Sequence, residues 1–136
     1  MTFKEECVKE TSDSKIKCEE RKSKIIFNNS KRKPVKKIKV DDCQITEGLR
    51  CDYLVLYKNQ EHFVELKGHD LHRAFKQLKS SIKDLGNNNA EKRVSYIISN
   101  YSPLSAATIQ NERRKFIKDF KSKLEVKSKN LTVKLT

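Results

Sequence analysis

The chain has 136 residues, which is enough for one domain with one modest hydrophobic core. Its 31 Lys and Arg residues outnumber 18 Asp and Glu residues, and the formal net charge of +13 is an excess expected of a protein that meets a polyanion such as nucleic acid. A merely soluble domain needs far less imbalance. A membrane surface is a poorer partner, because the sequence shows no Trp-bearing amphipathic helix.

Hydrophobic periodicity predicts alternating helices and strands within a single domain over residues 1–136. In the N-terminal half we expect, in chain order, helices over 3–27 with a break at 11–14, a basic loop over 28–34, a strand over 35–40, and a hairpin with arms 53–57 and 62–67. In the C-terminal half we expect a helix over 71–85, a buried strand over 94–99, a helix over 104–123 and one or two edge strands over 124–135.

The four cysteines and the apolar runs bear on the cellular compartment. Cys7, Cys18, Cys43 and Cys51 include no C-x-x-C pair, which argues against structural zinc. The sequence contains no signal peptide and no apolar run long enough to span a bilayer. We therefore expect an intracellular, cytoplasmic protein with free thiols and no membrane partner.

The hairpin is predicted to bring three candidate catalytic residues together. For a turn at Asn59-Gln60, the register places Leu54 opposite Glu65 and Asp52 opposite Lys67. Because side chains alternate along a strand, Glu65 and Lys67 share a face, and Asp52 joins them on it. A slip of one residue would move Asp52 to the other face.

These residue types suit a divalent metal beside an amine. Asp52 and Glu65 would supply the minimum of carboxylate ligands for Mg²⁺ or Mn²⁺, with Asp41 and Asp42 as either further ligands or ordinary turn acids. The Lys67 ammonium could orient a metal-bound water or stabilise the charge that develops on phosphorus. The triplet alone is common here, since acid-x-Lys begins at Asp13, Glu20, Glu65, Asp119 and Glu125. The Glu65 triplet is distinguished by a strand with an acid at its foot before it and a helix after it.

Asp52 followed thirteen residues later by Glu65-Leu66-Lys67 and then a helix resembles the PD-(D/E)XK phosphodiesterase superfamily, which includes restriction endonucleases, Holliday-junction resolvases and phage exonucleases. The resemblance implies an α/β fold with a restriction-endonuclease-like αββαβ core over about residues 15–100. A mixed central β-sheet would be flanked by helices, and a basic extension over 104–136 would add a C-terminal helix and edge strands. Cys51 stands where the motif has a Pro that is often absent.

The resemblance also implies roles for individual residues. Asp52 and Glu65 would be metal ligands and Lys67 the catalytic lysine. Either Glu19 or Glu20, on the first helix, would supply a further acid. Gln77 matches a Gln that some branches carry on the following helix, where it could bond the attacking water or a phosphate, or be a boundary residue without a role.

Two basic segments are predicted to contact phosphates. One contains Lys31, Arg32, Lys33, Lys36 and Lys37, and the other contains Arg113, Arg114, Lys115 and Lys118. Each neutralised phosphate releases counterions, so binding should weaken steeply with salt.

Together these features predict a metal-dependent nuclease, with DNA favoured over RNA as substrate. Little chain is left for a sequence-reading module, so we expect recognition of backbone shape, an end, a junction or a flap. The small size would suit a homodimer. Two other classes stay open: a non-catalytic nucleic-acid-binding module or nuclease subunit on the same fold, and a basic protein-interaction domain in which the acids and the lysine are incidental.

Overall fold

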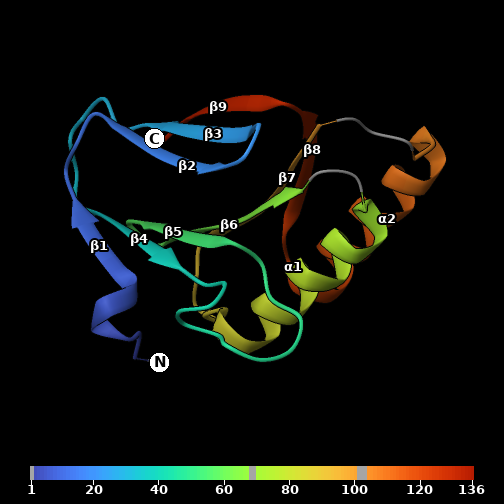
Figure 1. The fold of residues 1–136 in the computed structure, drawn as a ribbon, viewed down its shortest axis with the longest axis horizontal. Helices are drawn as coiled ribbons and strands as arrows, with labels where there is room; N and C mark the ends of the chain where they lie inside the picture. The colour runs from blue at the N-terminus through green and yellow to red at the C-terminus, as the bar shows by residue number, and fades with distance from the viewer. Residues whose placement is uncertain (1, 68–69, 101–103) are drawn as a thin grey trace.

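The computed structural model describes residues 2–67, 70–100 and 104–136 (Figure 1). A short 3₁₀ helix, η1 (Glu5–Cys7), precedes the strands. In chain order the described elements are β1 (Val8–Thr11), β2 (Lys15–Glu20), β3 (Ser23–Asn28), β4 (Val35–Lys39), β5 (Tyr53–Tyr57), β6 (Gln60–Lys67), α1 (Leu71–Leu85), β7 (Lys92–Ser99), α2 (Ala106–Phe120), β8 (Lys123–Ser128) and β9 (Asn130–Lys134). Within these ranges, neither helix has the length and apolar character needed to cross a membrane.

A large mixed sheet forms the centre of the molecule. Its strand order is β1-β4-β5-β6-β7-β8. In this order, β1 pairs antiparallel with β4, β4 with β5, and β5 with β6. Strand β7 pairs parallel with both β6 and β8. Parallel neighbours need a crossover connection, and α1 and α2 supply the two that this sheet requires.

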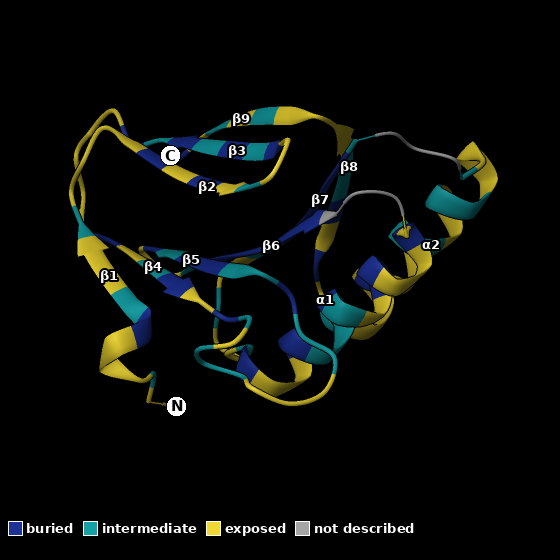
Figure 2. Cartoon of the chain, viewed as in Figure 1, coloured by how far each residue is buried: buried dark blue, intermediate teal, exposed yellow. Residues whose placement is uncertain are grey.

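A second sheet of three strands, in the order β2-β3-β9, covers one face of the large sheet, and the helices cover the other (Figure 1). One hydrophobic cluster, between helices and sheet, includes Leu54, Phe63 and Leu78, and a second cluster, between the two sheets, includes Phe27 and Val64. Neighbours on β6 such as Phe63 and Val64 therefore point into different cores. Figure 2 shows the result, with burial concentrated on the central strands and exposure on the outer surfaces.

The α/β class and most of the expected elements are confirmed. The predicted strand at 35–40, the hairpin, the helix at 71–85, the strand at 94–99 and the C-terminal helix are all present. The predicted edge strands are β8, which borders the large sheet, and β9, which pairs parallel with β3 in the small one.

The predicted N-terminal helices are wrong, because residues 3–27 form η1 and three strands. In this segment buried and more exposed residues alternate with the strand period of two, and the many charged residues obscure this alternation in the sequence. Ile16 and Cys18 are buried on one face of β2 while Lys15 and Lys17 are exposed, and β3 alternates in the same way. This alternation makes one face of the small sheet hydrophobic, and that face packs on the large sheet. The first helix of the implied αββαβ core is thus replaced by strands.

The expectation of free thiols is wrong for two of the four cysteines. Cys7 and Cys43 form a disulfide with a Cα–Cα distance of 5.7 Å, while Cys18 and Cys51 are free and buried. Strand β1 pairs antiparallel with β4, from Val8 opposite Ile38. The residue before β1 therefore lies beside the loop that follows β4, a proximity hidden by a sequence separation of 36.

Candidate active site

The two predicted metal-binding carboxylates lie at the same end of the large sheet. In the β5–β6 pair, Tyr57 is opposite Gln60 and Tyr53 is opposite Val64. Asp52 directly precedes Tyr53, and Glu65 directly follows Val64. The Asp52 N–H donates to the carbonyl of Val64, the residue already paired with Tyr53, so the regular pairing of the two strands ends at Tyr53.

The predicted register of this hairpin is wrong by two residues. The turn consists of Lys58 and Asn59, not Asn59 and Gln60, and Lys58 has a φ of 53°, as tight two-residue hairpin turns require. Leu54 consequently lies opposite Phe63. A shift of two residues leaves the side chains of the paired residues 53–57 and 60–64 on their predicted faces, whereas Asp52 lies outside this pairing.

Backbone contacts on both sides of Glu65 hold Asp52 in place. The Asp52 N–H donates to the Val64 carbonyl at 3.0 Å, and the Leu66 N–H donates to Asp52 Oδ2 at 2.7 Å. Glu65 is 1% exposed and lies on the face that the helices cover, as Phe63 does. Two carboxylates in such a site need hydrogen bonds or positive charge to offset their lost hydration.

Helix α1 fixes the segment that leads into Asp52. Gln77 Nε2 donates to the Arg50 carbonyl at 3.1 Å, and one turn later Ser81 Oγ accepts from the Cys51 N–H at 2.8 Å. The helix is thus hydrogen-bonded to both residues immediately before Asp52. Ser81 was not foreseen as part of the site, although it is a polar residue four positions after Gln77 within the apolar stripe of the helix.

Two amide oxygens beside this region have no hydrogen-bond partner among the described residues. They are Gln77 Oε1 and Asn100 Oδ1, and both atoms are buried. Asn100 follows Ser99, whose backbone is paired with that of Lys67 at the end of β6. Both oxygens are acceptors that a water or a hard cation could use.

The upstream acids are not on a helix, as predicted, but on β2 in the small sheet. Glu19 is exposed and lies 3.8 Å from the Lys17 ammonium. Glu20 is half-buried and lies near Tyr53. The pKa of Tyr53 is raised mainly by burial and, to a smaller extent, by nearby groups that include Glu20 and Asp52. The small sheet lies on the face of the large sheet opposite to Glu65, so Glu20 reaches the same end from the other side.

In the part of the chain that the structure describes, no group of three or more His, Cys, Asp and Glu side chains is arranged to hold a metal. Within the described ranges, Asp52 and Glu65 therefore have no third group of this kind arranged beside them for a metal. Asp41 and Asp42 both bind the Arg50 guanidinium, at 2.7 and 2.8 Å, and are turn acids.

Lys67 ends β6, and its backbone pairs with Ser99 of the parallel strand β7. The Lys67 side chain lies outside the described part of the structure, as do Gly68 and His69. The role predicted for the Lys67 ammonium therefore remains a prediction.

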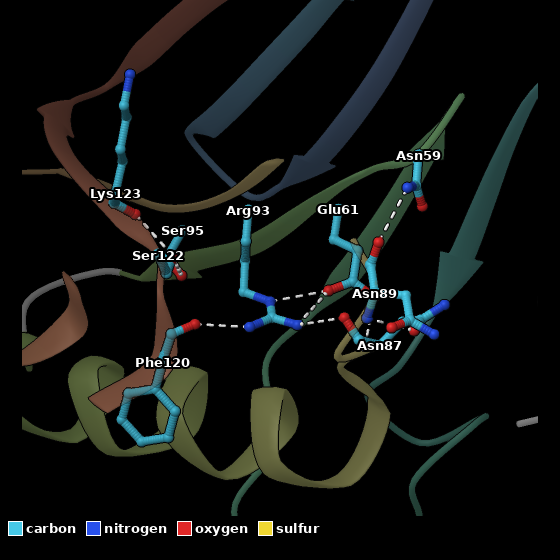
Figure 3. Close-up of polar contacts among 9 residues, drawn as sticks. All are labelled: Asn59, Glu61, Asn87, Asn89, Arg93, Ser95, Phe120, Ser122 and Lys123. Atoms are coloured by element: carbon cyan, nitrogen blue, oxygen red, sulfur yellow. Dashed lines mark hydrogen bonds and ion pairs between the residues drawn. The ribbon is translucent and has the colours of Figure 1, made fainter. Parts of the chain in front are cut away.

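A second buried glutamate on β6, Glu61, has an environment that the structure explains fully (Figure 3). Arg93 Nε and Nη2 both lie 2.8 Å from Glu61 Oε1, and the Asn87 N–H donates to Oε2 at 2.8 Å. Arg93 also donates to the Phe120 and Asn87 carbonyls. Glu61 thus joins β6, β7 and the ends of both helices, at the end of the sheet opposite to Glu65.

The two free thiols do not suit nucleophilic chemistry. Burial raises the pKa of Cys18 to about 12, and burial likewise raises the pKa of Cys51 well above its ordinary value. A thiol attacks as the thiolate, and neither residue forms one near neutral pH.

The basic segment at Lys31–Lys33 does not lie beside the carboxylates. It precedes β4, whose Val35 pairs with Tyr57 and whose Lys39 pairs with Tyr53, so it is at the end of the sheet away from Asp52. In the same segment Lys36 is exposed, while Lys37 is half-buried with its ammonium 2.6 Å from the Lys17 carbonyl.

The basic segment on α2 is at the far side of the molecule from Lys31–Lys33 (Figure 1). Several of its cations are occupied: Arg113 donates to the Leu124 carbonyl, Arg114 to Asn111 Oδ1, and Lys115 lies 3.7 Å from a Glu112 oxygen. Lys118 is exposed. The two segments therefore do not form one continuous surface around Asp52 and Glu65.

Comparisons of the chain with protein-family models, with curated proteins and with solved structures give no match. Function must therefore be inferred from the site itself.

Proposed function

We propose that the protein is a divalent-metal-dependent nuclease of restriction-endonuclease-like fold, which hydrolyses phosphodiester bonds in nucleic acid, with DNA favoured over RNA. The observation that carries this proposal is the position of Asp52, directly before β5, at the same end of the sheet as the buried Glu65 near the end of β6. Lone acids on the surface of a basic protein are common, but a glutamate that is only 1% exposed, at the same end of a sheet as a second acid, is not.

The order of elements around the pair supports the proposal. An acid stands before β5, Glu-x-Lys ends β6, α1 follows, and β7 returns parallel to β6. This strand-strand-helix-strand order agrees with the later part of the core that the sequence resemblance implies. The resemblance does not extend to the first helix, in whose place this chain has strands.

The donors present fit a hard divalent cation. Asp52 and Glu65 would hold Mg²⁺ or Mn²⁺, ions that are bound by one or two carboxylates and complete their coordination with water and substrate phosphate. Bound there, the ion would supply Lewis-acid stabilisation and lower the pKa of a water molecule. Gln77 would hold that water through its buried amide oxygen, and Lys67 would offset charge developing on the phosphate. Ser81 would position Asp52 through the backbone of Cys51.

Cleavage of a mixture of single-stranded, duplex and branched DNA and RNA, with Mn²⁺ present, tests the proposal. Glu65→Gln and Lys67→Ala should each lower the rate by about 10²-fold or more. The matched control is Asp119→Asn/Lys121→Ala, which alters another acid-x-Lys triplet at the end of α2 and should leave the rate unchanged. Absence of cleavage by the wild-type protein on every substrate, or equal rates in all variants, would contradict the proposal.

A second candidate is a nucleic-acid-binding module that does not cleave. It is favoured by the absence of a three-residue metal group among the described residues, and by the hydrogen bond that Asp52 Oδ2 already accepts from the Leu66 N–H. Such a protein would bind DNA with the same salt dependence, yet the Glu65 and Lys67 variants would change neither binding nor cleavage.

A further inference from the structure

Two tight turns meet at the end of the sheet where Asp52 and Glu65 lie. One is Arg21-Lys22 between β2 and β3, and the other is Lys129 between β8 and β9. The Lys129 N–H donates to the Ser99 carbonyl at 2.6 Å, and the Lys129 carbonyl accepts from the Lys24 N–H at 3.0 Å. Because Ser99 pairs with Lys67, both turns adjoin the carboxyl ends of β6 and β7, as Figure 1 also shows.

The two turns concentrate positive charge. We use the name basic turn surface for the five cations at and beside them, which are Arg21, Lys22, Lys24, Lys127 and Lys129. All are exposed except Lys24, which is half-buried, and the acids at their edge are Glu20 and the exposed Glu19, which is directly opposite Lys24. In the described part of the chain none of the five has a salt bridge, in contrast to Lys115 on α2.

The surface has the character of a polyanion site, not of a protein interface. Protein interfaces generally contain buried apolar or aromatic anchors. Among the described residues the exposed large hydrophobic side chain is Ile117, on α2 and outside the basic turn surface. Clustered cations at the same end of the sheet as two carboxylates instead suit a chain of phosphates.

We propose that the basic turn surface binds the phosphate backbone of a nucleic acid and directs it toward Asp52 and Glu65. This assignment rests on the proposed function of that site, but it concerns binding, which can be measured without cleavage. It replaces Lys31–Lys33 and α2, the segments that charge runs in the sequence favour, as the main phosphate contact. Those segments are at the wrong end of the sheet or already bonded within the protein.

The backbone provides matched variants. Arg21 and Lys129 have φ values of 53° and 65°, in the left-handed region that glycine enters more easily than other residues. Lys58 and Lys121 have φ values of 53° and 51°, but they lie at the opposite end of the sheet. Arg21→Gly/Lys129→Gly and Lys58→Gly/Lys121→Gly therefore remove the same charge and relieve the same conformation, and both doubles should fold.

Fluorescence anisotropy of labelled single-stranded and duplex DNA, in EDTA and over a range of salt concentrations, tests the assignment. The Arg21/Lys129 double should bind duplex about tenfold or more weakly and lower the salt slope by about 1.8, roughly 0.9 for each lost phosphate contact. The Lys58/Lys121 double should stay within about twofold of wild type. Equal losses in both doubles, no loss in either, or equally effective competition by polyglutamate would overturn the assignment.

The binding assay separates this inference from the proposed function. Normal binding by the Arg21/Lys129 double, together with cleavage that depends on Glu65, would refute the basic turn surface and leave the nuclease proposal intact. Binding that depends on the turns, together with no cleavage by any form of the protein, would support the surface and refute the nuclease.

Discussion

Glu61 and Glu65 offer a comparison within one strand. Both are buried on the same face of β6, four residues apart, but Glu61 accepts hydrogen bonds of 2.8 Å from Arg93 Nε and the Asn87 N–H and forms an ion pair of 2.8 Å with Arg93 Nη2. Replacing either residue by glutamine keeps the shape and removes the charge. If Glu61 is structural and Glu65 is a metal ligand, the two substitutions should affect different measurements.

The size of the Glu61→Gln effect can be estimated from its contacts. Hydrogen bonds to charged groups contribute about 1.5–3 kcal/mol, and breaking a buried ion pair costs about 3–5 kcal/mol. Arg93 keeps its bonds to the Phe120 and Asn87 carbonyls, so we expect a loss near the lower end, about 3 kcal/mol. Even a domain with only about 5 kcal/mol of stability would then remain about 97% folded at 25 °C, and Glu61→Gln should cleave at the wild-type rate.

Glu65→Gln should instead lower the cleavage rate by about 10²-fold or more. Urea unfolding gives the stability of each variant, and initial rates with Mn²⁺ at 25 °C give the activity. The reasoning is refuted if Glu65→Gln keeps its rate within a few-fold of wild type, or if both variants lose activity in proportion to their loss of stability.

Three further changes have expected outcomes. Ser81→Ala should cost about 1–2 kcal/mol in urea unfolding and lower the turnover rate with little effect on DNA affinity, because it removes the hydrogen bond that holds the backbone before Asp52. Reduction of the Cys7–Cys43 disulfide, or the double Cys→Ser variant, should lower the free energy of unfolding by up to about 4 kcal/mol, since the bond closes a loop of 36 residues; no change on adding reductant would show that the bond is absent in solution. Burial lowers the pKa of His62 to about 4, so the folded state holds this proton less firmly than the unfolded chain does. Its stabilisation should be complete above pH 6.5 and be lost, by about 3 kcal/mol, as the pH falls to about 4; a His62→Phe variant with the same pH profile of stability would contradict this.

Charge runs in the sequence and charge clusters in the structure differ here for a physical reason. A run such as Lys31-Arg32-Lys33 is visible in the sequence because its members are consecutive, and it lies on one exposed loop. The basic turn surface combines residues near positions 22 and 128, which meet only because Lys129 bonds to both Ser99 and Lys24. No pattern within either segment predicts that contact.

Local pattern predicted the alternation of helices and strands, the helix at 71–85 and the hairpin. These follow from side-chain periodicity, and the faces of the paired hairpin residues survived an error of two residues in register because the period of a strand is two. Tertiary structure decided what depends on contacts between distant segments: the N-terminal strands that need a second sheet to bury Ile16 and Cys18, the disulfide, and the placing of Glu20 on the opposite side of the sheet from Glu65. Such features gain their free energy from packing against residues far along the chain, so the local sequence does not record them.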